Sequence, residues 1–397
     1  MVKQVERIIY FGALLYALIC FVDGFFIPVS FALELDNYLF PFGFLYFLIV
    51  IQKYKKVRFF LLSFTLVFIW SSFVDFVKLG HFSISNLLHL FYFIKWPTLM
   101  SVFAIPYLKS VRTDNIHKVM DVLFLISMGI CILMMINPFG LGQFLQNIFA
   151  PKEYINYIYY NFPGTYRLAG VFLNANDNAL FIAAFILYYL FYRTKNEWYF
   201  TVLAISIFFV TQSRTVFLGL ILLLFLFLGL KYLKGRIEIT RSLKRLILGG
   251  FLILIFIFSS SRNLQSLFTG QAFQSNSIMT RFENFDAFKK DKQINHWVGR
   301  GVVRNPVKEI GIYIDSEIVS VLIQFGFIGF IFWGIIFISV FYITKKHHLN
   351  HFLFYYFILI FVASSTNYTL LGGHSGIIIS FFTAIHFFLN REKLISQ

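Results

Sequence analysis

The chain has 397 residues, of which 59% are hydrophobic and only 13% are charged, and its mean hydropathy is +0.76. This composition excludes a soluble globular protein, because so much apolar surface could not be hidden from water. The net charge of +16 does not indicate a nucleic-acid partner, because the positions of the basic residues fit membrane topology instead. We therefore predict an all-α integral membrane protein.

About twelve apolar runs are near the ~20 residues that a helix needs to cross a bilayer. The predicted spans cover residues 8–22, 38–51, 59–77, 87–108, 119–137, 178–192, 197–212, 215–230, 246–260, 316–343, 352–366 and 375–389. The connections at 138–177 and 261–315 are much longer than the others, and long ordered loops usually carry function. Residues 1–397 are thus predicted to form one polytopic membrane domain with two long loops on the same side.

Lysine and arginine indicate the orientation of these spans. They are concentrated in alternate connections, of which 53–58, 231–245 and 345–346 are the clearest. The positive-inside rule then places both termini on the cytoplasmic side and both long loops outside. Within the spans, Lys95 and Asp75 are predicted to form an intramembrane ion pair.

The first long loop ends in the stretch TYRLAGVFLNANDNALF, residues 165–181. Arg167 and Gly170 precede Asn174, Asn176 and Asp177 at the predicted start of the next helix. Asparagine and aspartate commonly cap helices, and an arginine at this height can simply anchor at lipid headgroups. The same residues also suit a polar site at the membrane surface, so both interpretations stay open.

The next outer turn reads TQSRT, residues 211–215, and joins two spans almost without a loop. Arg214 therefore lies at or below the outer membrane surface, where a cation is costly unless it is paired. One interpretation is that its side chain extends to lipid phosphate. The other is a functional site, which is the default hypothesis for an ionisable residue at this depth.

The second long loop is basic and leads into a span through RGVVRNPVKEIGIYIDSEIVSVLIQFGFIG, residues 300–329. Arg167, Arg214 and either Arg300 or Arg304 fall on one side of the membrane. Planar guanidinium groups from separate loops suit a pyrophosphate and would stabilise it as a leaving group, without a metal ion. Asp315 precedes the span and is either a general base or a helix cap.

In these stretches the chain resembles the superfamily of O-antigen polymerases (Wzy) and O-antigen ligases (WaaL). RLAGVFLNANDNA is similar to the family's Arg-x-x-Gly and Asn-x-Asn signature, and TQSRT to its Thr-x-Ser-Arg turn. Ser316, Gly326 and Gly329 fit the spacing of the ligase motif, but Asp315 stands where a ligase has histidine. Arg300 and Gly311 also fit an Arg-x10-Gly pattern of some polymerase loops. The resemblance therefore favours a polymerase.

The resemblance implies a GT-C-like glycosyltransferase of the bacterial inner membrane, with its active site facing the periplasm. The donor would be a glycan on undecaprenyl pyrophosphate, and the acceptor a repeat unit on a second such lipid. Asp315 would deprotonate the acceptor hydroxyl, and Arg167, Arg214, Arg300 and Arg304 would bind the pyrophosphate. No cofactor is implied; membrane lipids surround the protein, and a chain-length regulator is a candidate partner. Candidate substrate contacts are Asn176, Tyr160, Tyr166, Arg281 and His374, although the aromatic loop residues also suit an interfacial belt.

Two alternatives remain at this point. An O-antigen ligase would transfer the glycan to a lipid A core, and the acid at position 315 disfavours it. A flippase or transporter of lipid-linked sugars would need charges through the bilayer, yet the sequence places only Lys95 and Asp75 deep in the spans. Gly326 and Gly329 are predicted to permit close helix packing.

Overall fold

In the computed structural model the chain is helical. The structure describes residues 2–25, 35–81, 83–104, 113–136, 138–141, 144, 170, 172, 175–192, 204–205, 211, 213–233, 295–303, 316–365, 370 and 373–395. The main helices are α1 (Val2–Phe25), α2 (Leu35–Lys53), α3 (Lys55–Leu79), α4 (Ile84–Leu90), α5 (Tyr92–Ala104), α6 (Thr113–Ile136), α9 (Ala175–Tyr192), α11 (Arg214–Leu233), α16 (Glu317–Lys346), α17 (Phe352–Ser364), α18 (Gly373–Leu389) and α19 (Arg391–Ile395). Nine of the predicted spans each overlap one of these helices, whereas the predicted span 87–108 overlaps two, α4 and α5. The remaining two, 197–212 and 246–260, lie wholly or largely outside the described residues.

Several of the helices suit a bilayer. Among the described residues, five are long and apolar enough to cross a membrane, namely stretches of α1, α3, α6, α9 and α16. Shorter apolar helices cover Tyr38–Lys53, Phe352–Ser364 and Ser375–Leu389. Large apolar side chains stay exposed on helix faces, including Ile69 on α3 and Ile331 and Ile338 on α16. Such faces are stable next to lipid rather than water, so the chain has the character of a multi-pass α-helical membrane protein.

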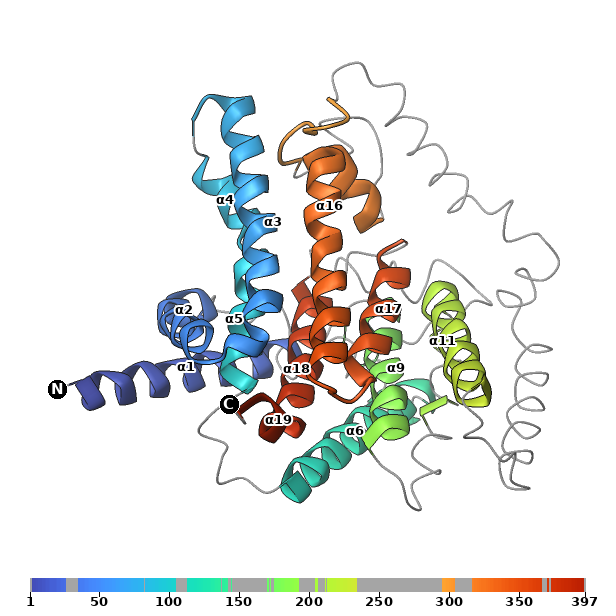
Figure 1. Cartoon of the computed structure of the whole chain (residues 1–397). Coiled ribbons are helices and arrows are strands. Elements are labelled where there is room, and N and C mark those ends of the chain that lie inside the picture. The colour runs from blue at the N-terminus through green and yellow to red at the C-terminus, as the bar shows by residue number, and fades with distance from the viewer. Residues whose placement is uncertain are drawn as a thin grey trace.

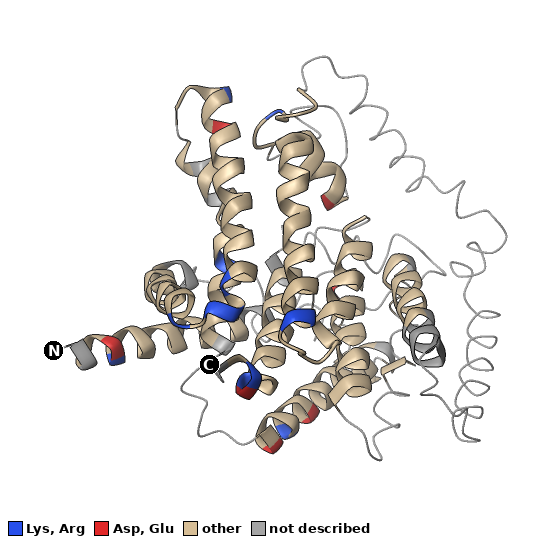
Figure 2. Ribbon diagram, viewed as in Figure 1, with Lys and Arg blue, Asp and Glu red and all other residues tan. Residues whose placement is uncertain are grey.

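The basic connections predicted on one side meet at one end of the molecule. Lys56, at the start of α3, donates from Nζ to the carbonyl oxygen of Lys393 in α19 at 2.6 Å. Lys393 in turn donates to the carbonyl oxygen of His348, just after α16, at 2.8 Å. Figure 2 shows lysine and arginine at the ends of α3 and at the lower end of α16; between the two ends of α3 the ribbon is uncharged except for Asp75 near the upper end. This distribution is the one expected of helices that pass through an apolar layer.

The helices α3 and α16 run side by side in opposite directions (Figure 1). Two pairs of side chains show this antiparallel packing: Ser63 Oγ lies 3.5 Å from Ser339 Oγ, and the ring centroids of Phe59 and Tyr342 are 5.9 Å apart. The core continues from α3 to α17 and α18 through rings packed around Phe60. This packing holds α16 in place within the core, and α16 carries part of the candidate site.

One feature of α16 differs from the predicted single span 316–343. Gly326 has φ 66° and ψ −170°, which interrupts the helix. Glu317 Oε1 accepts a hydrogen bond from Trp333 Nε1 at 2.8 Å, although sixteen residues of unbroken helix would separate them by about 24 Å. Residues 317–325 therefore fold back beside residues 327–346, as the short arm at the top of α16 shows in Figure 1. We call 317–325 the short arm and 327–346 the long arm.

Candidate functional site: a broken helix and the helix starts around it

The break in α16 is filled by a segment of the second long loop, residues 295–303. The carbonyl oxygens of Ile323 and Gln324 accept hydrogen bonds from the backbone N–H groups of Arg300 and Gly301, each at 2.9 Å. On the other side of the break, the N–H groups of Phe327 and Ile328 donate to carbonyl oxygens of this segment at 2.8 and 3.2 Å. Backbone groups that a helix break would leave unpaired at membrane depth are thus satisfied.

Arg300 is held at the break by this pairing. Arg300 is half-buried. Two side chains hold the residues that follow it: Asp75 accepts a hydrogen bond from Val302 N–H at 3.4 Å, and Gln324 Oε1 accepts one from Val303 N–H at 3.1 Å. Asp75 also accepts from Asn86 Nδ2 at 2.8 Å. The structure thus gives Asp75 other partners than the predicted Lys95, whose Nζ lies 5.7 Å from the Trp96 ring centroid.

The start of the short arm is buried beside the long arm. Ser316 is the N-cap residue, and its Oγ accepts from Val319 N–H at 3.4 Å and donates to the carbonyl oxygen of Ser364 at 3.3 Å. The capping role proposed as an alternative for Asp315 therefore belongs to Ser316. Glu317 is fully buried, and its Oε2 accepts from the N–H of Leu370 at 2.7 Å. A buried carboxylate needs such partners, because an unpaired charge in this environment is strongly unfavourable.

Hydrogen bonds near the start of the short arm connect the starts of three other helices, α9, α11 and α18. Asn176 Oδ1, in the first turn of α9, accepts from Ser213 Oγ at 2.9 Å, immediately before α11. Asp177 accepts from Ser375 Oγ in the first turn of α18. Leu370, three residues before α18, is bonded on one side to Glu317 and on the other to Trp96 of α5, whose Nε1 donates to its carbonyl oxygen at 2.6 Å. We call this group the polar cluster; it comprises Asn176, Asp177, Ser213, Ser316, Glu317, Leu370 and Ser375.

The electrostatics of the polar cluster combine two buried acids with helix starts. Asp177 and Glu317 are at most 8% exposed. The starts of α9, α11, α18 and the short arm carry partial positive charge from their N–H groups, which stabilises these carboxylates and would also attract an external anion. Glu317 was not among the site residues predicted from the sequence. One sequence feature could have indicated a role for Glu317: it is a carboxylate directly at the start of a long apolar run, with no loop between them.

Of the predicted site residues, the structure describes only some. Asp315, Arg167, Arg304, Tyr160, Tyr166 and Arg281 lie outside the described residues. Arg214 is the first residue of α11 and His374 the second residue of α18, and only their backbones are described. Asn176 belongs to the polar cluster, and the backbone of Arg214 follows directly on Ser213. The backbone N–H of Arg300 bonds to the carbonyl oxygen of Ile323. At the rise of an α-helix, Ile323 lies about 10 Å along the short arm from Ser316, so the Arg300 backbone is separated from Ser316 by a similar distance.

The two glycines predicted to permit packing have different roles. Gly329 lies in close contact, because a Cβ atom there would be 2.3 Å from Phe325 Cβ and 3.2 Å from Trp70 Nε1. The packing prediction is thus confirmed for Gly329. Gly326 instead supplies a backbone conformation that other residues rarely adopt.

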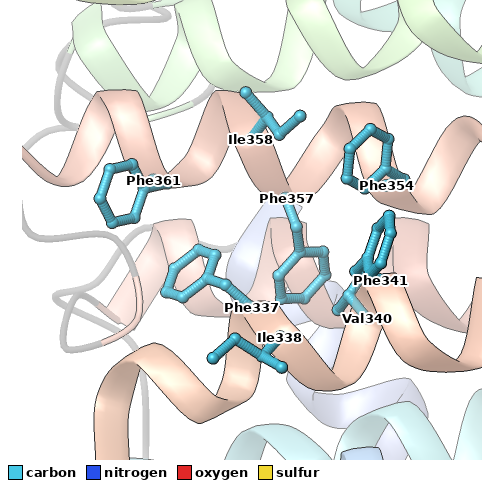
Figure 3. A pocket seen from close by; sticks show the side chains of 8 residues that line it. All are labelled: Phe337, Ile338, Val340, Phe341, Phe354, Phe357, Ile358 and Phe361. Atoms are coloured by element: carbon cyan, nitrogen blue, oxygen red, sulfur yellow. The ribbon is translucent and has the colours of Figure 1, made fainter. Parts of the chain in front are cut away.

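An apolar pocket of about 300 Å³ opens between the long arm and α17. Figure 3 shows its lining by eight side chains from the two helices, including Phe337, Phe341 and Phe354. Phe337 and Phe361 at one end of the pocket contact the ring of Trp333, with centroids 4.6 and 5.7 Å away. The pocket therefore begins one side chain away from Glu317 and leads along the two helices.

Comparison with known proteins gives no further assignment. No family model matches the chain, and no curated protein matches it.

Proposed function

We propose that the chain is a glycosyltransferase that polymerises lipid-linked oligosaccharide repeat units at the outer face of the bacterial inner membrane. It would transfer the growing glycan from undecaprenyl pyrophosphate to the sugar of an incoming undecaprenyl-pyrophosphate-linked repeat unit. The proposal includes about twelve spans in a GT-C-like arrangement, with both termini in the cytoplasm. It rests on the resemblance to O-antigen polymerases and on the arrangement of the helices that carry the similar stretches.

The observation that supports this proposal best is the hydrogen bond between Asn176 and Ser213. It joins the Asn-x-Asn stretch to the Ser-Arg turn, two stretches in which the sequence resembles the family and whose bonded residues are 37 positions apart. The third stretch, which begins at Asp315, continues into Ser316 and Glu317 of the same polar cluster. The proposal requires Arg214 and Asp315 to lie on the same side of the membrane.

In the proposed reaction Asp315 is the general base. The acceptor hydroxyl oxygen attacks the anomeric carbon of the donor glycan while its proton passes to the Asp315 carboxylate. The bond from that carbon to the pyrophosphate oxygen breaks, and undecaprenyl pyrophosphate leaves with the bonding electron pair. Arg167, Arg214, Arg300 and Arg304 would stabilise the leaving diphosphate, to which the helix starts of the polar cluster add further positive potential. The remaining candidate contacts would bind sugars.

The experiment uses purified protein in vesicles with lipid-linked repeat units, and the product is resolved as a ladder of glycan lengths. The wild-type chain should lengthen the glycan, and Asp315→Asn should abolish lengthening while the protein stays folded. Glu392→Gln, which removes an exposed carboxylate on α19, serves as the control and should leave the ladder unchanged. A normal ladder from Asp315→Asn would remove that residue from the mechanism. Addition of the glycan only to a lipid A core would identify a ligase instead.

A transporter of lipid-linked sugars is the second candidate, and the broken helix favours it. Discontinuous helices with buried polar groups at membrane depth form the substrate sites of many transporters. Glu317 and Asp177 also add buried charge that the sequence alone did not place in the membrane. The same vesicles separate the two functions, because a transporter moves the repeat unit across the bilayer without lengthening the glycan.

A further inference from the structure

Glu317 has no role in the proposed reaction, although its side chain makes two well-defined contacts. Its carboxylate is fully buried, and its two oxygens accept from donors on different parts of the chain. Oε1 accepts from the indole of Trp333 in the long arm, and Oε2 from the backbone N–H of Leu370 before α18. The side chain thus joins the start of the short arm to two neighbours that are distant from it in sequence.

We infer that Glu317 is a positioning residue: a latch that holds the start of the short arm and so fixes the joint at residues 315–316. This inference deepens the proposed function and rests on it for the catalytic consequence. A general base must be held close to its productive position, since small displacements lower the rate strongly. The joint is two residues or fewer from Glu317, whereas the break at Gly326 that also anchors the short arm is nine residues away.

The chemistry of the two contacts explains why the side chain is a carboxylate. Both partners are N–H donors, so the latch needs two acceptor oxygens at once. A glutamine has one acceptor oxygen and one NH₂ group, and the NH₂ group would face a donor on one side. Glu317→Gln should therefore break one of the two contacts although its volume is almost unchanged.

The first test follows the position of the short arm without reference to any activity. Val319, on the short arm, is 2% exposed, and Val340, on the long arm, is 1% exposed. Each is replaced singly by cysteine in a background in which Cys20 and Cys131 are serine, and its rate of reaction with N-ethylmaleimide is measured in detergent. Glu317→Gln should raise the rate at position 319 by about tenfold, the effect of losing one hydrogen bond to a charged group. The rate at position 340 should not change, which excludes general unfolding.

A double-mutant cycle then tests the contact itself. Trp333→Phe removes the indole donor, and in its presence Glu317→Gln should have a smaller effect on the labelling rate, because one donor no longer competes for the single oxygen. Trp70→Phe is the matched control, since Trp70 Nε1 donates to the carbonyl oxygen of Phe325 at 3.1 Å, at the other end of the short arm. The effects of Trp70→Phe and Glu317→Gln should be additive. Unchanged labelling at position 319 in Glu317→Gln would overturn the latch.

The catalytic consequence is tested in the vesicle assay. Glu317→Gln should lower kcat for glycan lengthening by about tenfold and leave KM for the lipid-linked acceptor unchanged, because binding is retained and the base is misplaced. An unchanged kcat together with faster labelling would overturn the positioning role. If the wild-type chain does not lengthen the glycan at all, the proposed function fails, while the labelling cycle still decides whether Glu317 holds the short arm.

Discussion

Replacement of Gly326 by alanine should change the free energy of unfolding in opposite directions for a broken and a continuous helix. In a continuous helix alanine is favoured over glycine by about 0.5–1 kcal/mol. At φ 66° and ψ −170°, by contrast, a residue with a Cβ atom is strained by about 1–3 kcal/mol. The new Cβ atom would also lie 2.4 Å from the carbonyl oxygen of Trp297 and 2.7 Å from the nitrogen of Gly299, both of them backbone atoms.

Relief of this clash requires the segment 295–303 to move away from the break. The hydrogen bonds of Phe327 and Ile328 to that segment would be lost, at about 1 kcal/mol each. Together with the strain, Gly326→Ala should lower the free energy of unfolding by about 3–5 kcal/mol.

The measurement is equilibrium unfolding of the purified protein in mixed micelles, followed by its helical circular dichroism. Gly334→Ala is the matched control, since this glycine lies in the long arm and a Cβ atom there would meet nothing within 4 Å. The control should be neutral or stabilising by about 0.5–1 kcal/mol. If Gly326→Ala is as stable as Gly334→Ala, the helix is continuous and the folded-back short arm does not exist.

Three further changes test other parts of the structure. Ser213→Ala removes the donor to Asn176 and should cost about 1 kcal/mol of stability in the same unfolding assay, with slower glycan lengthening; an unchanged rate would separate this contact from activity. Gly376→Ala should destabilise the protein by about 1–3 kcal/mol, because a Cβ atom there would lie 2.1 Å from the Trp96 ring, and a neutral effect would contradict the packing of α5 on α18. Burial and then the charges of Lys56, Lys346 and His348 lower the pKa of His347. The unfolded chain therefore binds this proton more readily, so stability should be complete above pH ~6.5 and decline below it; in His347→Gln this decline should be smaller.

The helices and their shared ends could be predicted from the sequence. Hydropathy alone determines where a chain must become helical in a bilayer, because only helices satisfy the backbone there without a partner. The spacing of basic residues likewise predicted that the connections around Lys56, Lys346 and Lys393 would share one end, and contacts between them confirm it. The order of the polar stretches predicted that Asn176 and Ser213 would lie on one side, where they now form a hydrogen bond.

The tertiary structure alone decided how α16 is built. A glycine in an apolar run such as QFGFIGF fits a packed helix as well as a broken one, and local sequence does not separate them. The break is stable because residues 295–303, some 25 positions earlier in the chain, supply the missing hydrogen bonds. In the same way Glu317 is buried rather than solvated because Trp333 and Leu370, distant in sequence, bring their N–H groups to it. Hydropathy reports the solvent that each segment prefers, whereas pairing between distant polar groups depends on contacts that exist only after the chain has folded.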